Sequence, residues 1–511
     1  MKSIFQKLAK IFLVVFGMIL SWIIATGILE YNFIIFKFNP VILILGISIY
    51  MILIAFFFSK ILKKLENIKW IEYPIFVVFT ILCIISALYF KLKPSWDMGT
   101  TFEIAKEYVQ SGTITNTFYL SQFPNNVMMA SVEIVFLKML SIFGVKDYLT
   151  AITVINAIVV SATVILSFYT TKKISNKRNA LMFLFICLFT TPFYLYSAEY
   201  YTDTFSMIIS VLLLYIWLFI REKKNGLLKR VIIDLVYAFV LFIGIKLKLT
   251  SAFVFIAIVV YEIVQLNLKT LAKNLVVILP VTVLFIIVFN NTVVNKFALP
   301  EKRFLNEIPK EHWIMMGMNG VGSFSFDEYA YTNSYKTYPE KQQAARDKIK
   351  ERLKEREMST HVRNITYKLG FAWHDGTYYA PVVLRNEPVT RGVIHETVFE
   401  NGKNALYYKY IPQTMHFAML IFIIFNIIRI IKEKDYESKD IITITTMFGV
   451  MLFLILWENR SRYLVNILPL MIMSQINGID KFSKYLESSI KEWKFNSKKG
   501  LLPSDCERKA E

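Results

Sequence analysis

The sequence predicts an all-α polytopic membrane protein with about twelve transmembrane helices, and three observations predict this class. Hydrophobic residues make up 55% and aromatic residues 15% of the 511 residues, which is too apolar for an ordinary soluble domain. The apolar residues are gathered in runs of roughly 20, the length that crosses a bilayer as a helix. Lys and Arg are gathered in the loops between alternate runs, as expected when positive residues are retained on the cytoplasmic side.

Twelve apolar runs define the expected membrane helices. They lie near residues 11–29, 40–59, 72–90, 148–170, 180–196, 204–220, 231–247, 250–264, 275–290, 413–431, 441–457 and 463–479. The basic loops between alternate runs are "KILKKLENIK", "TKKISNKR", "REKKNGLLKR", "NLKTLAKN" and "IIKEKDYESKD". Their alternation predicts that both termini are cytoplasmic. No small-residue cleavage site follows the basic first residues, so we expect the first run to be retained as a helix.

Two long segments fall on the side opposite the basic loops. Residues 91–147 contain an amphipathic stretch, "TFEIAKEYV", and an apolar stretch interrupted by Glu133 and Lys138, which predicts two interfacial helices. Residues 291–412 are rich in Tyr, Lys, Glu and Asn, which predicts a folded external domain of mixed structure. The expected division is 1–70 for a two-helix membrane addition, 71–290 for the membrane core with its external loop 91–147, 291–412 for the external domain, 413–480 for the C-terminal membrane helices and 481–511 for a cytoplasmic basic tail.

The overall charge and the cysteines exclude several other classes. The net charge of +20 comes from basic residues placed between apolar runs and not gathered on one soluble face, so no nucleic-acid partner is expected. The cysteines Cys83, Cys187 and Cys506 are far apart and show no CxxC spacing, which indicates neither a disulfide framework nor a zinc site.

Ionisable residues at the predicted outer ends of the spans form an acidic and a basic set on one membrane face. They are Asp97, Glu199, Asp203, Lys248, Glu458, Arg460 and Arg462. Any one of them could be an interfacial anchor, but several loops that offer such residues on the same side favour a site. The central parts of the spans are nearly free of Asp, Glu, Lys and Arg.

This distribution separates two classes of function. A coupled transporter tends to carry its polar site near the bilayer midplane, whereas an enzyme with a lipid-linked substrate needs it at headgroup level. A carboxylate at headgroup level can accept a proton from an acceptor hydroxyl, and nearby cations can neutralise a phosphate leaving group. The sequence therefore favours a membrane enzyme.

Four segments resemble the GT-C glycosyltransferases, most closely glycosyltransferase family 39, the branch of protein O-mannosyltransferases and aminoarabinose transferases. They are "PSWDMG" followed by "YLSQFPNN", then "YYTDTFSM", "GIKLKLTSAF" and "ENRSRYLVNILPL". The resemblance covers residues 72–480 and implies a GT-C-like fold and a polyprenyl-phosphate sugar donor. The chain departs from the protein mannosyltransferases at one point, because Met98 follows Asp97 where those enzymes carry an Asp-Glu pair.

The expected function is an inverting glycosyltransferase of the cell membrane, a multi-pass protein with its active site on the extracytoplasmic side. Asp97 is expected to be the general base, Lys248 with Arg460 or Arg462 to hold the donor phosphate, and Glu199 and Asp203 to orient sugar or metal. Glu458 joins the substrate-binding set. The acceptor is left open as a cell-wall polymer, surface glycan, lipid or protein. The alternatives are a polysaccharide polymerase or ligase that uses lipid-linked oligosaccharide, and a lipid-sugar flippase or transporter.

Two further questions stay open in the sequence. A divalent cation (Mg²⁺ or Mn²⁺) on Asp97, Glu199 and Asp203 is an alternative to neutralisation of the phosphate by Lys and Arg. The external segment carries "EHWIMMGMNG" and "FAWHDGTYYAP", whose aromatic residues suit either sugar binding or the core of that segment. Adjacent pairs such as His374 and Asp375 rarely chelate one ion, so a metal there is not expected.

Overall fold

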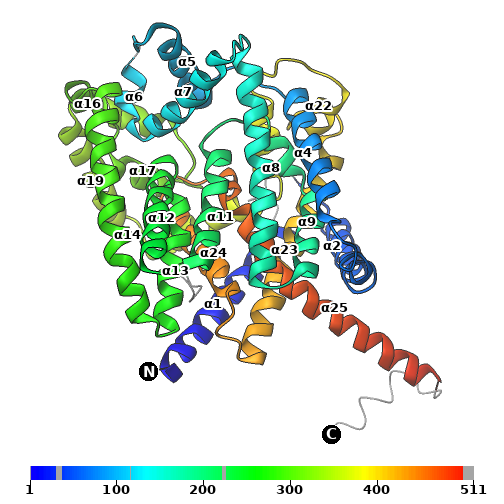
Figure 1. Cartoon of the computed structure of the whole chain (residues 1–511). Helices are drawn as coiled ribbons and strands as arrows, with labels where there is room; N and C mark the ends of the chain where they lie inside the picture. The colour runs from blue at the N-terminus through cyan, green and yellow to red at the C-terminus, as the bar shows by residue number, and fades with distance from the viewer. Residues whose placement is uncertain (1, 30–36, 116, 221–225, 499–511) are drawn as a thin grey trace.

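The chain is built of helices joined by loops (Figure 1). The computed structural model describes residues 2–29, 37–115, 117–220 and 226–498. Within these ranges there is no strand, and one isolated bridge joins Leu92 to Pro388. The expected all-α class is confirmed.

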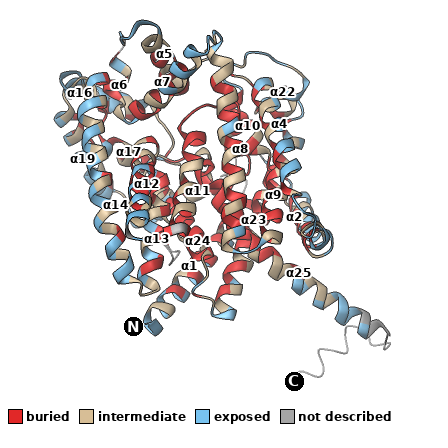
Figure 2. Cartoon of the chain, in the orientation of Figure 1, coloured by how far each residue is buried: buried red, intermediate tan, exposed pale blue. Residues whose placement is uncertain are grey.

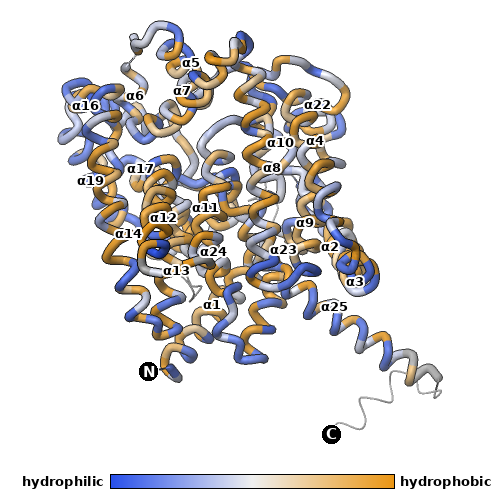
Figure 3. Tube along the Cα trace, viewed as in Figure 1, coloured by the Kyte–Doolittle hydropathy of each residue, from blue (hydrophilic) through white to orange (hydrophobic). Residues whose placement is uncertain are grey.

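Thirteen of the described helices run through or along the bundle. They are α1 (Lys2–Leu29), α2 (Pro40–Phe56), α4 (Glu72–Tyr89), α8 (Tyr148–Ile174), α9 (Lys177–Phe189), α10 (Thr191–Tyr196), α11 (Thr202–Ile220), α12 (Leu227–Leu247), α13 (Ala252–Val264), α14 (Leu268–Phe289), α23 (Ala405–Glu433), α24 (Asp440–Leu456) and α25 (Leu468–Lys498). Apolar residues cover most of their length, and hydrophilic residues gather at their ends (Figure 3). This is the pattern of helices that cross a bilayer.

Length and composition identify the strongest membrane spans. Among the described residues, seven helices are long and apolar enough to cross a membrane. They are Lys2–Leu29, Pro40–Leu65, Glu72–Tyr89, Pro124–Ile142, Tyr148–Ile174, Leu268–Phe297 and Ala405–Glu433. Shorter apolar helices cover Thr202–Leu218, Leu249–Val264 and Asp440–Leu456. The expected number of twelve spans stays a prediction.

Several expected spans are interrupted near their ends. The run at 180–196 divides into α9 and α10, and Pro192 lies at the start of α10, where the missing backbone N–H costs no helical hydrogen bond. The run at 463–479 begins as a 3-10 helix, η6 (Ser461–Ile467), before α25. These interruptions lie beside the polar residues singled out above.

The core of the bundle is formed by α8, α11, α23 and α24, whose buried residues fill the centre of the molecule (Figure 2). Both α1 and α2 pack against α23. The cysteines Cys83 and Cys187 are buried free thiols, and Cys506 lies outside the described residues. No disulfide is therefore formed between the two described cysteines.

The first long loop folds over one end of the bundle. It contains α5 (Trp96–Ser111), α6 (Phe118–Gln122), the 3-10 turn η3 (Pro124–Asn126) and α7 (Val127–Ile142). Helices α5 and α7 pack against each other and lie beyond the ends of α11 and α12 (Figure 1). The left-handed Gly112 ends α5, a position where a residue without Cβ adopts positive φ at little cost. Helix α7 lies in Pro124–Ile142, one of the stretches long and apolar enough to cross a membrane, so the expected interfacial pair stays a prediction.

The second long segment, residues 291–412, was expected to have mixed structure, and this is wrong, because every regular element described in it is a helix. Its helices are α15 (Asn295–Phe297), α16 (Pro300–Asn306), α17 (Lys310–Gly317), α18 (Phe326–Asn333), α19 (Tyr338–Glu355), α20 (Met358–Trp373), α21 (Ala380–Leu384) and α22 (Val393–Val398). The longest of them, α19, is rich in Glu, Lys, Gln, Arg and Ala, the strongest helix formers. A capping box between Thr337 and Glu340 starts it.

The two ends of the described chain lie on the same side. Helix α1 begins, and α25 ends, at the end of the bundle opposite α5, α7, α16 and α22 (Figure 1). Helix α25 extends through the first part of the expected basic tail to Lys498, and residues 499–511 lie outside the described ranges. The expected cytoplasmic placement of both termini stays a prediction.

Candidate functional site

The polar residues singled out in the sequence come from loops and helix ends that are distant along the chain. Asp97 lies in the first turn of α5, Asp203 in the first turn of α11, and Glu199 in the turn before α11. Lys248 follows the last residue of α12, while Glu458, Arg460 and Arg462 lie between α24 and α25. Each helix fixes the backbone position of the site residue at its end, and the side chains extend from these ends toward one another.

Four of these residues form a buried charge cluster. Lys248 Nζ pairs with Asp203 Oδ1. Arg462 Nη1 lies 3.9 Å from Glu199 Oε1, and Arg462 Nε lies 3.9 Å from Asp203 Oδ2. The side chains of Glu199 and Asp203 are 0% exposed, whereas those of Lys248 and Arg462 are 13% and 12% exposed. The two carboxylates are thus shielded from solvent, and a ligand that approaches the cluster meets the two cations first.

This cluster is incompletely hydrogen-bonded. Arg462 Nε, both carboxyl oxygens of Glu199 and Asp203 Oδ2 are buried without a hydrogen-bond partner. A separation of 3.9 Å is too long for a hydrogen bond, so Arg462 is attracted to the carboxylates without being fixed on them. Buried polar groups that lack partners are uncommon and are costly in a low-dielectric environment. Their concentration at one place marks it as a candidate binding site.

The environment changes the ionisation of the cluster. Burial, reinforced by the nearby Asp203 carboxylate, raises the pKa of Glu199 to about 8, although Arg462 and Lys248 oppose the shift. Burial likewise lowers the pKa of Lys248, against the opposing effect of Asp203. Glu199 is therefore mostly protonated at neutral pH, which leaves the remaining charges of the cluster, Asp203 against Lys248 and Arg462, net positive.

Asp97 is supported by a chain of hydrogen bonds. The Tyr119 hydroxyl donates to Asp97 Oδ1 at 2.8 Å, and Asn126 Nδ2 donates to Tyr119 Oη at 2.6 Å. The Tyr201 hydroxyl donates to Asn126 Oδ1 at 3.2 Å. The carboxylate is also stabilised by its place in the first turn of α5, where the helix dipole favours negative charge. Asp97 is partly exposed and so can reach a substrate.

Trp96 joins Asp97 to the charge cluster. Its backbone has φ 44°, a left-handed conformation that is strained for a residue with a large side chain. Its ring lies 4.9 Å from the Arg462 guanidinium and 5.7 Å from the Tyr201 ring. A guanidinium over an indole face is a favourable cation–π contact. The backbone strain at Trp96 thus lies between Asp97, the candidate base, and Arg462, a candidate phosphate ligand.

Glu458 and Arg460 lie on the other flank of the site. Burial raises the pKa of Glu458, opposed by Arg460 and Arg462, and Asp97 is near enough to reinforce the rise. The guanidinium carbon of Arg460 lies 5.2 Å from the Tyr379 ring, and Arg460 Nε is buried without a hydrogen-bond partner. Arg460 therefore lies at the edge of the cluster, against an aromatic face.

The loop that carries the two arginines is held by the 291–412 segment. Lys368 Nζ donates to Trp457 O at 2.7 Å and to Gly317 O at 2.8 Å. The Asn459 backbone N–H donates to Gly322 O at 2.8 Å. Burial lowers the pKa of Lys368 to about 7, opposed by Glu458. These bonds join helices α17 and α20 to the site loop.

A second attachment is made by Asp375. Its carboxylate accepts hydrogen bonds from Ser461 Oγ at 2.7 Å, from Thr377 Oγ1 at 2.6 Å and from the Tyr379 N–H at 2.8 Å. Tyr378 and Tyr379 both have positive φ, at 54° and 67°. Asp375 therefore stabilises a strained turn and places Tyr379 beneath Arg460.

Sequence reasoning missed most of these supporting residues. Trp96, Tyr119, Asn126 and Tyr201 lie in the quoted motifs, and their aromatic and amide character next to Asp97 was the available signal. The sequence did not indicate the role of Lys368, because its partners are backbone carbonyls that lie far from it along the chain.

The described residues do not fit a metal site. No group of three or more His, Cys, Asp and Glu side chains within the described ranges could hold a metal ion. Asp203 is occupied by Lys248, and Asp97 by Tyr119. The two histidines considered in the sequence have other partners, since His374 Nε2 lies 3.1 Å from Thr26 Oγ1 and His312 Nδ1 lies 2.7 Å from Thr332 Oγ1.

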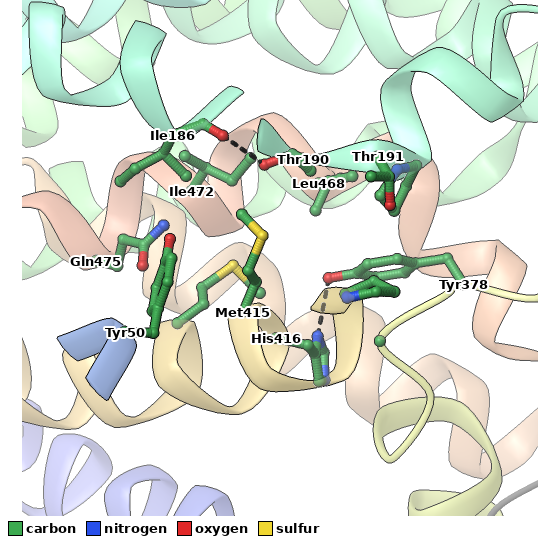
Figure 4. A pocket seen from close by; sticks show the side chains of 14 residues that line it. Tyr50, Ile186, Thr190, Thr191, Tyr378, Met415, His416, Leu468, Ile472 and Gln475 are labelled. Atoms are coloured by element: carbon green, nitrogen blue, oxygen red, sulfur yellow. Dashed lines mark hydrogen bonds between the residues drawn. The ribbon is translucent and has the colours of Figure 1, made fainter. Parts of the chain in front are cut away.

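A separate cavity lies behind the strained tyrosine turn, between α2, α10, α23 and α25 (Figure 4). Its volume is about 30 Å³, and Tyr50, Tyr378, His416 and Gln475 are among its polar lining residues. The Tyr378 hydroxyl lies 2.9 Å from His416 Nδ1, and Gln475 Oε1 is buried without a partner. The other lining residues are mainly apolar, and a cavity of this size has room for one or two waters beside its few polar groups. None of the seven residues predicted for the site lines it.

Comparison with solved structures finds similar arrangements at low sequence identity. The archaeal oligosaccharyltransferase AglB from Archaeoglobus fulgidus, in complex with an inhibitory peptide and a dolichol-phosphate, is 13% identical with a TM-score of 0.44. That alignment covers 83% of this chain and 52% of AglB, so this chain spans about half the length of AglB.

ArnT from Cupriavidus metallidurans is similar in two states. The apo structure is 12% identical with a TM-score of 0.35, and the structure bound to undecaprenyl phosphate is 14% identical with a TM-score of 0.34. Each alignment covers 80% of this chain and 77% of ArnT. A comparison with curated proteins finds no sequence match. A family profile described as conserved hypothetical integral membrane protein matches residues 1–481, and the chain therefore belongs to that family of integral membrane proteins.

Proposed function

We propose that the protein is a membrane glycosyltransferase that moves a sugar from a polyprenyl-phosphate donor to an extracytoplasmic acceptor, with inversion at the anomeric carbon. The observation that carries the proposal is the juxtaposition of two kinds of group in one site. Asp97 is a hydrogen-bonded, partly exposed carboxylate, and the ring of its chain neighbour Trp96 lies against the Arg462 guanidinium. A base and an anion-binding group joined in this way suit a hydroxyl nucleophile and a phosphate leaving group.

The donor phosphate is placed over Lys248 and Arg462. Both cations cover buried carboxylates and are themselves slightly exposed, so an incoming phosphate meets positive charge first. The guanidinium fork of Arg462 matches two phosphate oxygens, while Lys248 supplies a point charge. Protonated Glu199 favours the same outcome, because a second buried carboxylate charge would repel the phosphate.

Asp97 acts on the acceptor as the general base. Its carboxylate accepts the proton of an acceptor hydroxyl as the hydroxyl oxygen bonds to the anomeric carbon. The bond between that carbon and the phosphate oxygen breaks on the opposite face, and its electron pair leaves with polyprenyl phosphate. Asp97 holds the proton after transfer and then loses it to solvent. The Tyr119 hydroxyl orients the carboxylate, which is how a base is held in line with its substrate.

The motifs that resemble GT-C glycosyltransferases support the same proposal, because they contain Asp97, Asp203, Lys248 and Arg462. A transporter is less well supported, since the charged cluster lies at helix ends and in loops. A polymerase or ligase would share the lipid-linked donor and differ in its oligosaccharide partners. The distribution of Lys and Arg among the loops supports an extracytoplasmic placement of the site.

The test is transfer by the purified protein in liposomes that contain a panel of synthetic polyprenyl-phosphate monosaccharides. Release of polyprenyl phosphate that requires an added acceptor is the expected result. Movement of the donor between leaflets without release would identify a transporter instead. Turnover only with lipid-linked oligosaccharides would identify a polymerase or ligase.

A further inference from the structure

Three aromatic side chains lead away from the candidate base. The Tyr119 ring lies 5.4 Å from the Phe123 ring, and the Phe123 ring lies 6.4 Å from the Trp313 ring. The Tyr119 hydroxyl donates to Asp97 at the inner end. We refer to Tyr119, Phe123 and Trp313 as the aromatic track.

The exposure of these rings distinguishes a binding surface from a core. All three rings of the aromatic track are partly exposed. Trp373, the other tryptophan of the 291–412 segment, is 0% exposed and belongs to the core. The sequence left both tryptophans open as sugar-binding or core residues, and their burial separates them. Tyr119 packs against the hydrophobic core of the bundle, whereas Phe123 and Trp313 are partly exposed and are not among the described rings that pack against that core.

The aromatic track is built across two segments that are fixed to each other. Phe123 lies in the turn between α6 and η3, whereas Trp313 lies on α17. The Ile308 N–H donates to Gln122 O at 3.1 Å, and Lys302 Nζ donates to Thr117 Oγ1 at 2.6 Å. Helices α6 and α16 pack against each other at one end of the molecule (Figure 1). The rings are therefore held in place before a ligand arrives, which lowers the entropic cost of binding.

The neighbouring polar groups indicate the class of ligand. Asn125, two residues after Phe123, is exposed, and the Tyr119 hydroxyl donates to Asp97. A sugar ring presents an apolar C–H face that packs on aromatic rings and hydroxyls that bond to amides and carboxylates. A peptide acceptor bound by strand addition would need a sheet edge, and none exists among the residues that the structure describes. The combination of rings and amides fits a glycan better than an acyl chain or an extended peptide.

We propose that the aromatic track is the acceptor subsite and that the acceptor is a glycan of at least two sugar rings. Its terminal hydroxyl lies at Asp97, and the following rings stack on Phe123 and Trp313. This assignment rests on the proposed function for the identity of the reaction, but its binding test does not require turnover.

The experiment measures binding of the purified full-length protein to immobilised oligosaccharides and, on the same surface, to peptides of matched size. Oligosaccharides of two or more rings are expected to bind, and peptides are not. Trp313→Leu and Phe123→Leu remove a ring at similar volume and should weaken glycan binding by about tenfold or more, as for other central aromatic anchors. Trp313→Phe keeps a ring and should stay within roughly threefold of the parent affinity.

The matched control is Phe326→Leu, because Phe326 is 79% exposed in the same segment and is not in contact with the aromatic track. It should bind glycans as the parent does. Preference for peptides, absence of glycan binding, or unchanged binding in both Trp313→Leu and Phe123→Leu would overturn the proposal. If the parent binds glycans and transfers from no donor, the proposed function fails while the acceptor subsite stands.

Discussion

At the scale of single residues, the charge on Asp97 separates a catalytic role from an anchoring one. Asp97→Asn keeps the volume and removes the charge, so we expect transfer to be abolished while the protein stays inserted and folded. Because the Tyr119 hydroxyl can still donate to an amide oxygen, the local structure should persist. Initial rates of transfer and the thermal unfolding temperature are the two measurements.

The matched control for Asp97 is Asp147→Asn in the same loop. Asp147 Oδ1 accepts from the Thr150 N–H at 3.0 Å and caps α8, a role that Asn fills equally well. This variant should keep parent activity. Near-normal turnover in Asp97→Asn would rule out the base assignment.

Lys248 is the second residue whose role can be isolated. Loss of a charge-assisted contact costs roughly 1.5–3 kcal/mol, so Lys248→Met should raise the donor requirement or lower turnover by about one to two orders of magnitude. Lys246→Met is the control, because Lys246 Nζ donates to Asn290 Oδ1 and takes no part in the cluster. Rate against donor concentration is the measurement, and equal curves for the two variants would contradict phosphate binding by Lys248.

Glu199 predicts a pH dependence. Its raised pKa of about 8 means that the carboxyl is neutral below that pH and gains a negative charge as pH rises through it. The KM for the donor should therefore increase above about pH 8. Lys248 also loses charge on the alkaline side, since burial lowers its pKa, so the comparison with Glu199→Gln isolates the carboxyl. A pH profile of KM that is identical in parent and Glu199→Gln would contradict this prediction.

At the scale of elements, the apolar runs predicted the positions of the long helices well. The run at 148–170 became α8 and the run at 204–220 became α11, because roughly 20 apolar residues specify a helix almost independently of context. The interruptions near 190 and 461–467 were not predicted, since they depend on packing at the ends of the bundle. The helical content of the 291–412 segment could have been read from the composition of α19.

Helix α20 provides an element-scale prediction through Lys368. Lys368→Met leaves Trp457 O and Gly317 O without their donor, which costs roughly 1–3 kcal/mol of stability. It also releases the loop that carries Glu458 and the arginines, so the donor KM should rise together with the loss of thermal stability. Thermal unfolding and donor-dependent rates are measured on the same preparations.

A second buried lysine gives the control for Lys368. Lys341 Nζ donates to Leu305 O at 3.0 Å and to Asn306 O at 3.2 Å, within the 291–412 segment. Lys341→Met should lower thermal stability without changing the donor KM. If both lysine variants lose stability equally and keep the parent KM, the link to the site loop does not position the arginines.

At the scale of the whole molecule, sidedness is the property that the sequence predicts and labelling can test. Ser334→Cys should react with a membrane-impermeant thiol reagent in intact cells, whereas Ser175→Cys and Ser438→Cys should not. Ser334 and Ser175 are both exposed, so accessibility differs only through the membrane. The assay uses a Cys506→Ser background, because Cys83 and Cys187 are buried. The reverse labelling pattern would place Asp97 in the cytoplasm.

The sequence predicted that four site residues lie on the same side, because the positive residues of the loops assign a side to every helix end. These residues, which the structure brings together, are Glu199, Asp203, Lys248 and Arg462. Residues at helix ends on the same membrane face are confined to a small region, so their side chains are expected to lie close together. The hydrogen bonds from Tyr119 to Asp97 and from Lys368 to Trp457 could not be predicted in this way. They depend on exact tertiary approach, and Lys368 finds its partner 89 residues along the chain.

The attachment of the 291–412 segment to the loop at Trp457–Ser461 has a consequence for the history of the protein. Lys368 Nζ donates to Trp457 O on that loop. In the other direction, the Asn459 N–H donates to Gly322 O and Ser461 Oγ donates to Asp375. A segment exchanged between relatives by recombination would arrive without the partners of these bonds unless the loop were exchanged with it. We therefore expect the two stretches to change together among relatives, although the helices α23 and α24 separate them along the chain.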